Sequence, residues 1–154
     1  MSRSTPVPEV MTTDVLTFRP EDAVRDAMTL LVDRDIDAGP VVDAAGRVVG
    51  MLSTGDLVVR DARLHVPTVI NLLGVNIELP HKSVNDEIGK ALGGSVGEVM
   101  SKKAITCGPD ATIEDAATLM HREDVSRLAV VASDGTLLGL IARGDIVRAL
   151  VREE

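Results

Sequence analysis

Aromatic residues are almost missing from this chain of 154 residues, which has one Phe and no Tyr or Trp. Proteins that bind single-stranded nucleic acid stack bases on such side chains, so their scarcity disfavours that class. The formal net charge of -8 also disfavours it, because phosphate backbones attract basic surfaces. We therefore expect no nucleic acid partner, although one local cluster of Arg or Lys is enough to bind a small nucleotide. Since 45% of the residues are hydrophobic, the chain can still bury a core.

Cysteine and histidine are scarce as well. Cys107 is the only cysteine, which excludes an intramolecular disulfide and a cysteine zinc site, and we expect it to be a small buried residue. None of the three histidines has a ligand-like partner four residues on, so no metal site is predicted. The sequence also has no P-loop and no nucleophile–base pair. We therefore predict no catalytic residues and a protein that is not an enzyme.

Long hydrophobic runs are missing too. The N-terminus has no apolar core of the kind found in secretory signals. The longest uncharged stretch in the middle of the chain runs from Val66 to Ile77, whereas a membrane-spanning helix needs about 20 residues. These absences predict a cytoplasmic protein without a membrane partner.

The chain does contain an internal duplication. A shift of 89 positions, which places Val10 on Val99, aligns the two halves without a gap as far as Arg60 and Ala149. An ungapped match of this length indicates two copies of one structural unit. The most regular matches are glycines followed by an aspartate, at Gly46, Gly50, Gly55 and Asp56 in the first copy and Gly135, Gly139, Gly144 and Asp145 in the second.

Each copy predicts the same order of elements, β-α-β-β-α. Pro20 and Pro109 predict helix starts, because the first helical turn tolerates a missing N–H. Apolar residues at helical spacing follow, and turn residues then separate two short apolar runs, as in a β-hairpin. By number, the extended segments are 15–18 and 104–107, the hairpin strands are 39–43 with 47–52 and 128–132 with 136–141, and the last helices begin near Ser53 and Ala142.

A single copy has a small sheet with one apolar face that it cannot cover alone. We therefore predict an α/β (α+β) fold, with two repeats packed sheet to sheet around a pseudo-twofold axis and clefts between them. The repeats are expected at 7–60 and 96–150, joined by an insert at 61–95 with a short helix between Ser83 and Gly93. The apolar segment from Val66 to Ile77 either packs on its own domain or forms an exposed contact patch.

The repeated pattern resembles the CBS motif. It reads VPEVMTTDVLTFRPED and GPVVDAAGRVVGMLSTGDL in the first copy, and VGEVMSKKAITCGPDA and LAVVASDGTLLGLIARGDI in the second. The resemblance implies a CBS pair, also called a Bateman module, which usually forms a homodimer shaped as a flat disc. It also implies that an adenosine-containing ligand, such as AMP, ADP, ATP or S-adenosylmethionine, binds in a cleft between the repeats. No cofactor is required by such a module.

The strand-to-helix turns supply the first candidate ligand contacts. Backbone N–H groups at a helix start favour an anion. Ser53 adds a hydroxyl toward phosphate, and Asp56 can accept hydrogen bonds from ribose hydroxyls, as the matching residues do in CBS pairs. Capping of the helix by the same two residues is the open alternative. In the second copy Asp145 remains, Ala142 lacks the hydroxyl, and Arg143 offers a cation for phosphate, so the two clefts are expected to differ chemically.

The other candidates lie at the strand starts. Arg127, whose counterpart is Ala38, stands where some nucleotide-binding CBS pairs carry a phosphate-contacting base, and a solvated surface Arg is the alternative. Lys102 and Lys103 leave the same choice open. The family lines its adenine pocket along the leading extended segments, and a role as ordinary strand-edge threonines is the open alternative for the two threonines there. Small or apolar residues at the strand starts offer a flat surface to a base. These candidates are Thr17, Thr106, Gly39, Pro40, Leu128 and Ala129.

Two functions remain in competition. The first is a regulatory module that senses an adenosine nucleotide and thereby changes the activity of a partner protein that the sequence does not identify. The second is a ligand-free dimeric scaffold, suggested by the lost hydroxyl at Ala142, which docks its partner through the segment from Val66 to Ile77.

Overall fold

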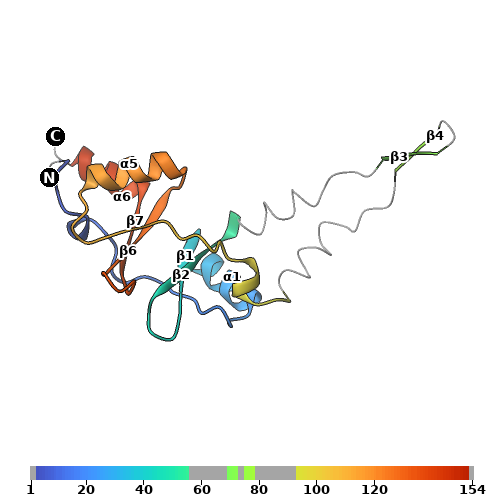
Figure 1. The fold of residues 1–154 in the computed structure, drawn as a ribbon, viewed down its shortest axis with the longest axis horizontal. Coiled ribbons are helices and arrows are strands. Elements are labelled where there is room, and N and C mark those ends of the chain that lie inside the picture. The colour runs from blue at the N-terminus through green and yellow to red at the C-terminus, as the bar shows by residue number, and fades with distance from the viewer. Residues whose placement is uncertain (1–2, 56–68, 73–74, 79–92, 153–154) are drawn as a thin grey trace.

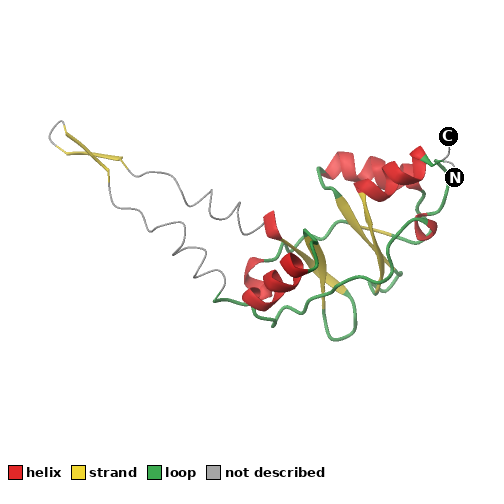
Figure 2. Ribbon diagram, turned by 180° about the vertical axis from the view of Figure 1, so that it is seen from behind, coloured by secondary structure: helices red, strands yellow, loops and turns green. Residues whose placement is uncertain are grey.

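The structure is a computed structural model that describes residues 3–55, 69–72, 75–78 and 93–152. Two similar units hold most of these residues (Figure 1). The strands of both units lie on the inside, in line with the predicted packing of sheet on sheet, and the longer helices lie on the outside (Figure 2). The elements are η1 (Val7–Glu9), α1 (Val24–Asp33), β1 (Ala38–Val42), β2 (Val48–Ser53), β3 (Val69–Leu72), β4 (Val75–Glu78), α4 (Val96–Val99), β5 (Thr106–Cys107), α5 (Ile113–Glu123), β6 (Arg127–Val131), β7 (Leu137–Ala142) and α6 (Arg143–Val151).

The two predicted hairpins are confirmed, and each strand differs from its expected range by one residue at either end. β1 pairs antiparallel with β2, and β6 pairs antiparallel with β7 while β5 joins β6 in parallel. The turns require glycine, because Gly46 and Gly135 have φ angles of 81° and 89°, a region that side chains disfavour. The turn residues in the sequence therefore determined the hairpin positions.

The predicted helix starts at Pro20 and Pro109 are wrong. α1 begins at Val24 and α5 at Ile113, several residues after the prolines. Thr112 provides the physical reason in the second unit, because it forms a capping box with Asp115. The Asp115 N–H donates to Thr112 Oγ1 over 3.1 Å, and the Thr112 N–H donates to Asp115 Oδ2 over 3.0 Å.

The leading segment of each unit packs on the other unit. The η1 residue Val7 is fully buried in the core of the second unit, and its N–H donates to Ala111 O over 2.8 Å. Reciprocally, the α4 residues Val96 and Val99 are buried in the core of the first unit, and the Val96 N–H donates to Asp22 O over 2.8 Å. The core of each unit is therefore completed by the segment that precedes the other unit in the sequence.

The two cores are otherwise built from matching positions. Each combines the inner face of a long helix, α1 or α5, with the inner residues of one hairpin, as amphipathic patterning predicts, and α6 adds Ile146 and Ala149 to the second core. The first core contains Phe18, Val24, Ala27, Met28, Leu31, Val41, Leu52, Val96 and Val99, and the second contains Val7, Ile113, Ala116, Met120, Leu128, Val130, Ile141, Ile146 and Ala149.

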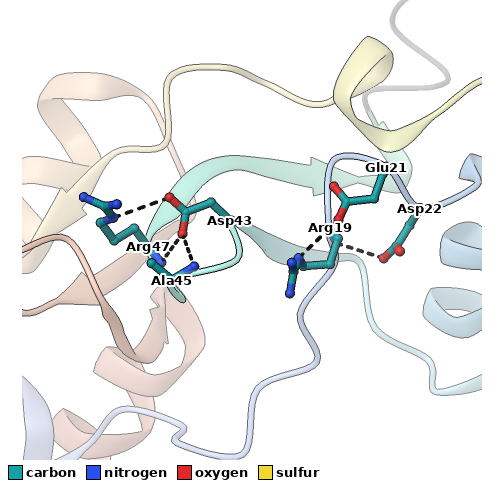
Figure 3. Close-up of polar contacts among 6 residues, drawn as sticks. All are labelled: Arg19, Glu21, Asp22, Asp43, Ala45 and Arg47. Atoms are coloured by element: carbon teal, nitrogen blue, oxygen red, sulfur yellow. Dashed lines mark hydrogen bonds and ion pairs between the residues drawn. The ribbon is translucent and has the colours of Figure 1, made fainter.

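The turns of the two hairpins also meet. The Val48 N–H donates to Gly135 O over 3.1 Å, and the Leu137 N–H donates to Gly46 O over 3.0 Å. Around this junction, Asp43 accepts hydrogen bonds from the N–H groups of Ala45 and Arg47 over 2.9 and 3.0 Å and pairs with the Arg47 guanidinium (Figure 3). The junction ties the two units together at the end of the hairpins away from Ser53.

In the insert, β3 and β4 form an antiparallel hairpin of their own. It falls within the apolar segment from Val66 to Ile77 and just beyond it. The short helix expected after Ser83 lies outside the described residues. Among the helices that the structure describes, none is long and apolar enough to span a bilayer.

Methionine packing against glycine yields a stability prediction. A Cβ at Gly139 would lie 2.7 Å from both Met11 Sδ and Thr12 O, and one at Gly50 would lie equally close to Met100 Sδ and Ser101 O. We expect Gly139→Ala and Gly50→Ala each to lower the free energy of unfolding by about 1–3 kcal/mol, measured by urea denaturation, because a tight core resists extra volume. Gly108→Ala is the control, since its Cβ meets nothing within 4 Å. Equal stability of all three variants would contradict the close packing.

Acid should weaken the hairpin junction. The backbone hydrogen bond from Arg47 lowers the pKa of Asp43, and that from Thr136 lowers the pKa of Asp134. Because a lowered pKa in the folded state favours folding only while the carboxylate is charged, this stability is present above the unfolded value of about 3.9 and is lost as the pH falls through the folded values. We expect Asp43→Asn to unfold at lower urea concentration at neutral pH and to lose less stability on acidification.

Unfolding midpoints from pH 6 to pH 2.5 would measure this dependence. Asp33→Asn, which removes the same charge from the end of α1, serves as the control. An acid profile of Asp43→Asn that parallels the wild type would show that the carboxylate does not stabilise the turn.

Candidate functional site

A cavity of about 250 Å³ opens at the seam between the two units. We call it the Ser53 cleft. Its walls come from the end of β2, from the chain between α4 and β5, and from the turn between α5 and β6, so both repeats contribute. The lining residues are Met51, Ser53, Ser101, Lys103, Ala104, Ile105, Asp124, Val125, Ser126 and Arg127.

Backbone hydrogen bonds hold these walls in place. Met51 and Ser101 exchange two bonds, with N···O distances of 3.0 and 2.9 Å, which fixes the chain after α4 against β2. On the other side, the Arg143 N–H donates to Ser126 O over 2.8 Å. Asp124 ends α5 with a left-handed φ of 53°, which turns the chain into β6. The cleft is therefore formed by backbone that the fold itself positions.

The polar groups of the cleft favour an anion. Arg127 is half-buried and Lys103 is exposed, and three serine hydroxyls from different segments line the same cavity. Asp124 is the single acidic residue among the lining residues that the structure describes. Arginine and lysine together with hydroxyl donors are the groups that bind phosphate oxygens in proteins. No cluster of three or more metal-ligating side chains occurs among the residues that the structure describes.

Two of the predicted site residues come together here. Ser53, at the end of β2, and Arg127, at the start of β6, line the same cleft although they belong to different repeats. Asp56 lies outside the described residues. Thr17 is exposed in the segment before Phe18. Thr106 lines a different hollow of about 590 Å³ beside β5 and the end of β6.

Four predicted residues do not offer the expected open surface. Gly39, Pro40, Leu128 and Ala129 are buried in the inner strands of the two hairpins. The space beside Gly39 is occupied, because a Cβ there would lie 2.7 Å from Leu16 O and 2.9 Å from Phe18 Cε2. The interpretation of these residues as a flat surface for a base is corrected accordingly, since they contribute to the core.

The second strand-to-helix turn is engaged with the protein itself. Asp145 Oδ2 accepts the Ala142 N–H over 2.8 Å, and its other oxygen pairs with Arg148, so this carboxylate caps α6. The Arg143 guanidinium donates to Val125 O over 3.4 Å and lines a groove of about 320 Å³ between α5 and α6. The expected role of Arg143 as a cleft cation is corrected, because its side chain lies in this helical groove.

Cys107 also lies away from the Ser53 cleft. It is partly buried against the second core, and desolvation raises the pKa of its thiol. A raised pKa keeps the thiol protonated and weakly reactive, in line with its predicted role as a small apolar residue.

The sequence missed several lining residues. The role of Lys103 was left open between ligand contact and solvated surface residue, because two adjacent lysines give no sign of which one faces a cleft. Ser101 and Ser126 carry a signal, since each lies within two residues of a base that was already a candidate, Lys103 or Arg127. The contact between Met51 and Ser101 depends on the exchange of leading segments, which local patterns do not encode.

Relatives of this chain are known. A protein from Methanocaldococcus jannaschii, MJ1426, is 32% identical over 157 residues, which cover 94% of this chain and 90% of that protein. The chloroplastic CBS domain-containing protein CBSX1 of Arabidopsis thaliana is 32% identical over 90% of this chain, which spans 60% of that protein's length. The crystal structure of CBSX2 in complex with AMP superposes with a TM-score of 0.73 at 28% identity, covering 97% of this chain and 98% of that one.

The family assignment rests on both copies of the duplication. The model of the CBS domain matches residues 7–63 and again residues 96–152. The hairpin of the first unit lies within the first match and the hairpin of the second unit within the second. The chain therefore belongs to the family of CBS-domain proteins, and its two repeats form a CBS pair.

Proposed function

We propose that this protein is a regulatory module that binds an adenosine nucleotide in the Ser53 cleft. The observation that carries the proposal is the lining of this cleft, where two bases and three hydroxyls from both repeats converge. Phosphate oxygens pair with such bases, and hydroxyls and backbone groups complete the contacts. AMP is the favoured ligand because the related protein CBSX2 has been crystallised with AMP.

The size of the cleft favours a mononucleotide. Small-molecule sites typically enclose about 300–1,000 Å³, and the Ser53 cleft, at about 250 Å³, is just below that range. A mononucleotide fits such a site with part of its surface left in solvent. A dinucleotide such as NAD is larger and disfavoured.

The proposed regulation follows from the position of the cleft at the seam. A ligand that contacts Ser53 on β2 and Arg127 on β6 binds both repeats at once. Any arrangement of the repeats that brings these walls together then binds the ligand more tightly and becomes more populated. A partner protein that recognises this arrangement would respond to the nucleotide concentration.

The functional form in this proposal is a homodimer. Val147, Leu150 and Val151 follow one another at helical spacing along α6 and are 54%, 40% and 65% exposed. Val147 also lines the groove between α5 and α6, together with Ala117, Met120 and Ile146. A second copy of the chain would cover these apolar residues, in keeping with the dimers that CBS pairs commonly form.

AMP should stabilise the protein against heat. At a concentration of 100 times Kd, a ligand that binds only the folded state adds about 2.7 kcal/mol, which corresponds to a rise in Tm of roughly 5–10 °C for a domain of this size. Ser53→Ala should weaken AMP binding about ten-fold in calorimetric titration, because a hydrogen bond to a charged group is lost. The second repeat already carries Ala142 at this position, so the fold accommodates alanine.

Thr29→Ala, on the exposed face of α1, is the matched control and should bind AMP as the wild type does. All proteins are freed of co-purified nucleotide before titration. If millimolar AMP, ADP, ATP and S-adenosylmethionine leave the Tm of the wild type unchanged, the module senses no adenosine ligand and the scaffold function takes its place.

Charge on α6 should dissociate the dimer. Val147→Asp places a carboxylate in the proposed contact, where burial without a partner is costly. We expect light scattering at micromolar concentration to give the mass of two chains for the wild type and of one chain for this variant. Leu138→Asp, on β7 and 38% exposed, should remain dimeric. A wild type that is monomeric, or a Val147→Asp variant that stays dimeric, would exclude this face as the contact.

A further inference from the structure

The duplication provides an internal comparison for the Ser53 cleft. Shifting each of its lining residues by 89 positions identifies the counterpart positions at the other seam. Some counterparts keep their apolar character, but the charged positions change. The counterparts are Thr12, Asp14, Val15, Leu16, Asp35, Ile36, Asp37, Ala38, Leu140 and Ala142.

These positions are equivalent in the fold as well as in the alignment. Thr12 and Leu140 exchange two backbone hydrogen bonds of 2.9 Å, as Ser101 and Met51 do. The Thr54 N–H donates to Asp37 O over 2.9 Å, matching the bond between Arg143 and Ser126. Asp35 and Asp124 share a φ of 53°. The backbones of the two seams are therefore closely similar, and their side chains can be compared directly.

The comparison reveals a reversal of charge. Asp14 replaces Lys103, Ala38 replaces Arg127, and Asp37 replaces Ser126. Among the lining residues that the structure describes, the Ser53 cleft thus has two bases and one acid, whereas their counterpart positions have three acids and no base. Asp14, Asp35 and Asp37 are all exposed, so they face solvent from which a ligand would arrive. Fixed carboxylates repel a phosphate dianion and raise the local concentration of cations instead.

We propose that the chain binds one phosphate-bearing ligand, in the Ser53 cleft, and that Lys103 is the residue that selects for the phosphate. The acidic counterpart seam rejects the same ligand. This inference rests on the proposed function and adds to it a stoichiometry of one per chain and a preference for nucleotides over uncharged nucleosides.

Lys103 is the better selector of the two cleft bases. Arg127 is half-buried at the start of β6, so part of its side chain is used in packing. Lys103 is an exposed lining residue and carries its charge on a flexible stem. Its replacement should change the affinity for phosphate with little effect on the fold, since the counterpart seam has an aspartate at this position.

The test is calorimetric titration of nucleotide-free protein with AMP and, separately, with adenosine. We expect the wild type to bind one AMP per chain and to bind AMP at least ten-fold more tightly than adenosine. Lys103→Asp should reduce this ratio to roughly one while the Kd for adenosine changes less than about two-fold, because a lost charge-assisted hydrogen bond corresponds to about a ten-fold change. Raising the salt concentration should reduce the ratio in the wild type, since screening weakens exposed charges.

Lys102→Asp is the matched control, because Lys102 is exposed beside Lys103 but does not line the cleft. It should keep the wild-type ratio, and the Tm of each unliganded variant checks folding. Two AMP molecules per chain, equal wild-type affinities for AMP and adenosine, or an unchanged ratio in Lys103→Asp would each overturn this inference while the nucleotide-sensing function stands. Binding of neither AMP nor adenosine by the wild type would overturn both.

Discussion

The reciprocal exchange of leading segments is the interaction on which the rest of the structure depends. Val7 completes the core of the second unit, and Val96 and Val99 complete the core of the first. The apolar core of each unit includes residues that precede the other unit in the sequence. Burial of these side chains therefore couples the folding of the two units. Because the crossing chains also pair with β2 and β7, the exchange determines how the two hairpins face each other at the seam.

The same exchange links ligand binding to domain packing. Ser101 lies two residues after α4, pairs with Met51 on β2, and lines the Ser53 cleft. A ligand in the cleft thus contacts the chain that crosses between the units just beyond its buried anchor, Val99. In the proposed function, a ligand bound here would favour, by linkage, the packing of α4 that best forms the cleft. A small nucleotide can in this way influence surfaces that it does not touch.

The sequence predicted the local parts of the fold and named two residues that line the Ser53 cleft. The hairpins were predicted to within one residue because Gly46 and Gly135 mark turns through their positive φ. The helix starts were misplaced because proline tolerates a first turn but does not require one, and Thr112 caps α5 instead. Ser53 and Arg127 were predicted through the family pattern, whereas the burial of Gly39 and the turning away of Arg143 depend on contacts between distant segments.

Core and cleft positions have diverged differently since the duplication. Matching core positions keep their character, as in Ala27 with Ala116 and Leu52 with Ile141, because a close-packed interior tolerates only residues of similar volume. The cleft positions Lys103 and Asp14 have opposite charge, and exposed side chains of either sign are compatible with the same backbone. Packing therefore constrains the two repeats to one architecture while leaving the electrostatics of each seam free to specialise. A symmetric fold can in this way carry basic side chains at one seam and acidic side chains at the matching positions of the other, which is the asymmetry that our proposal uses.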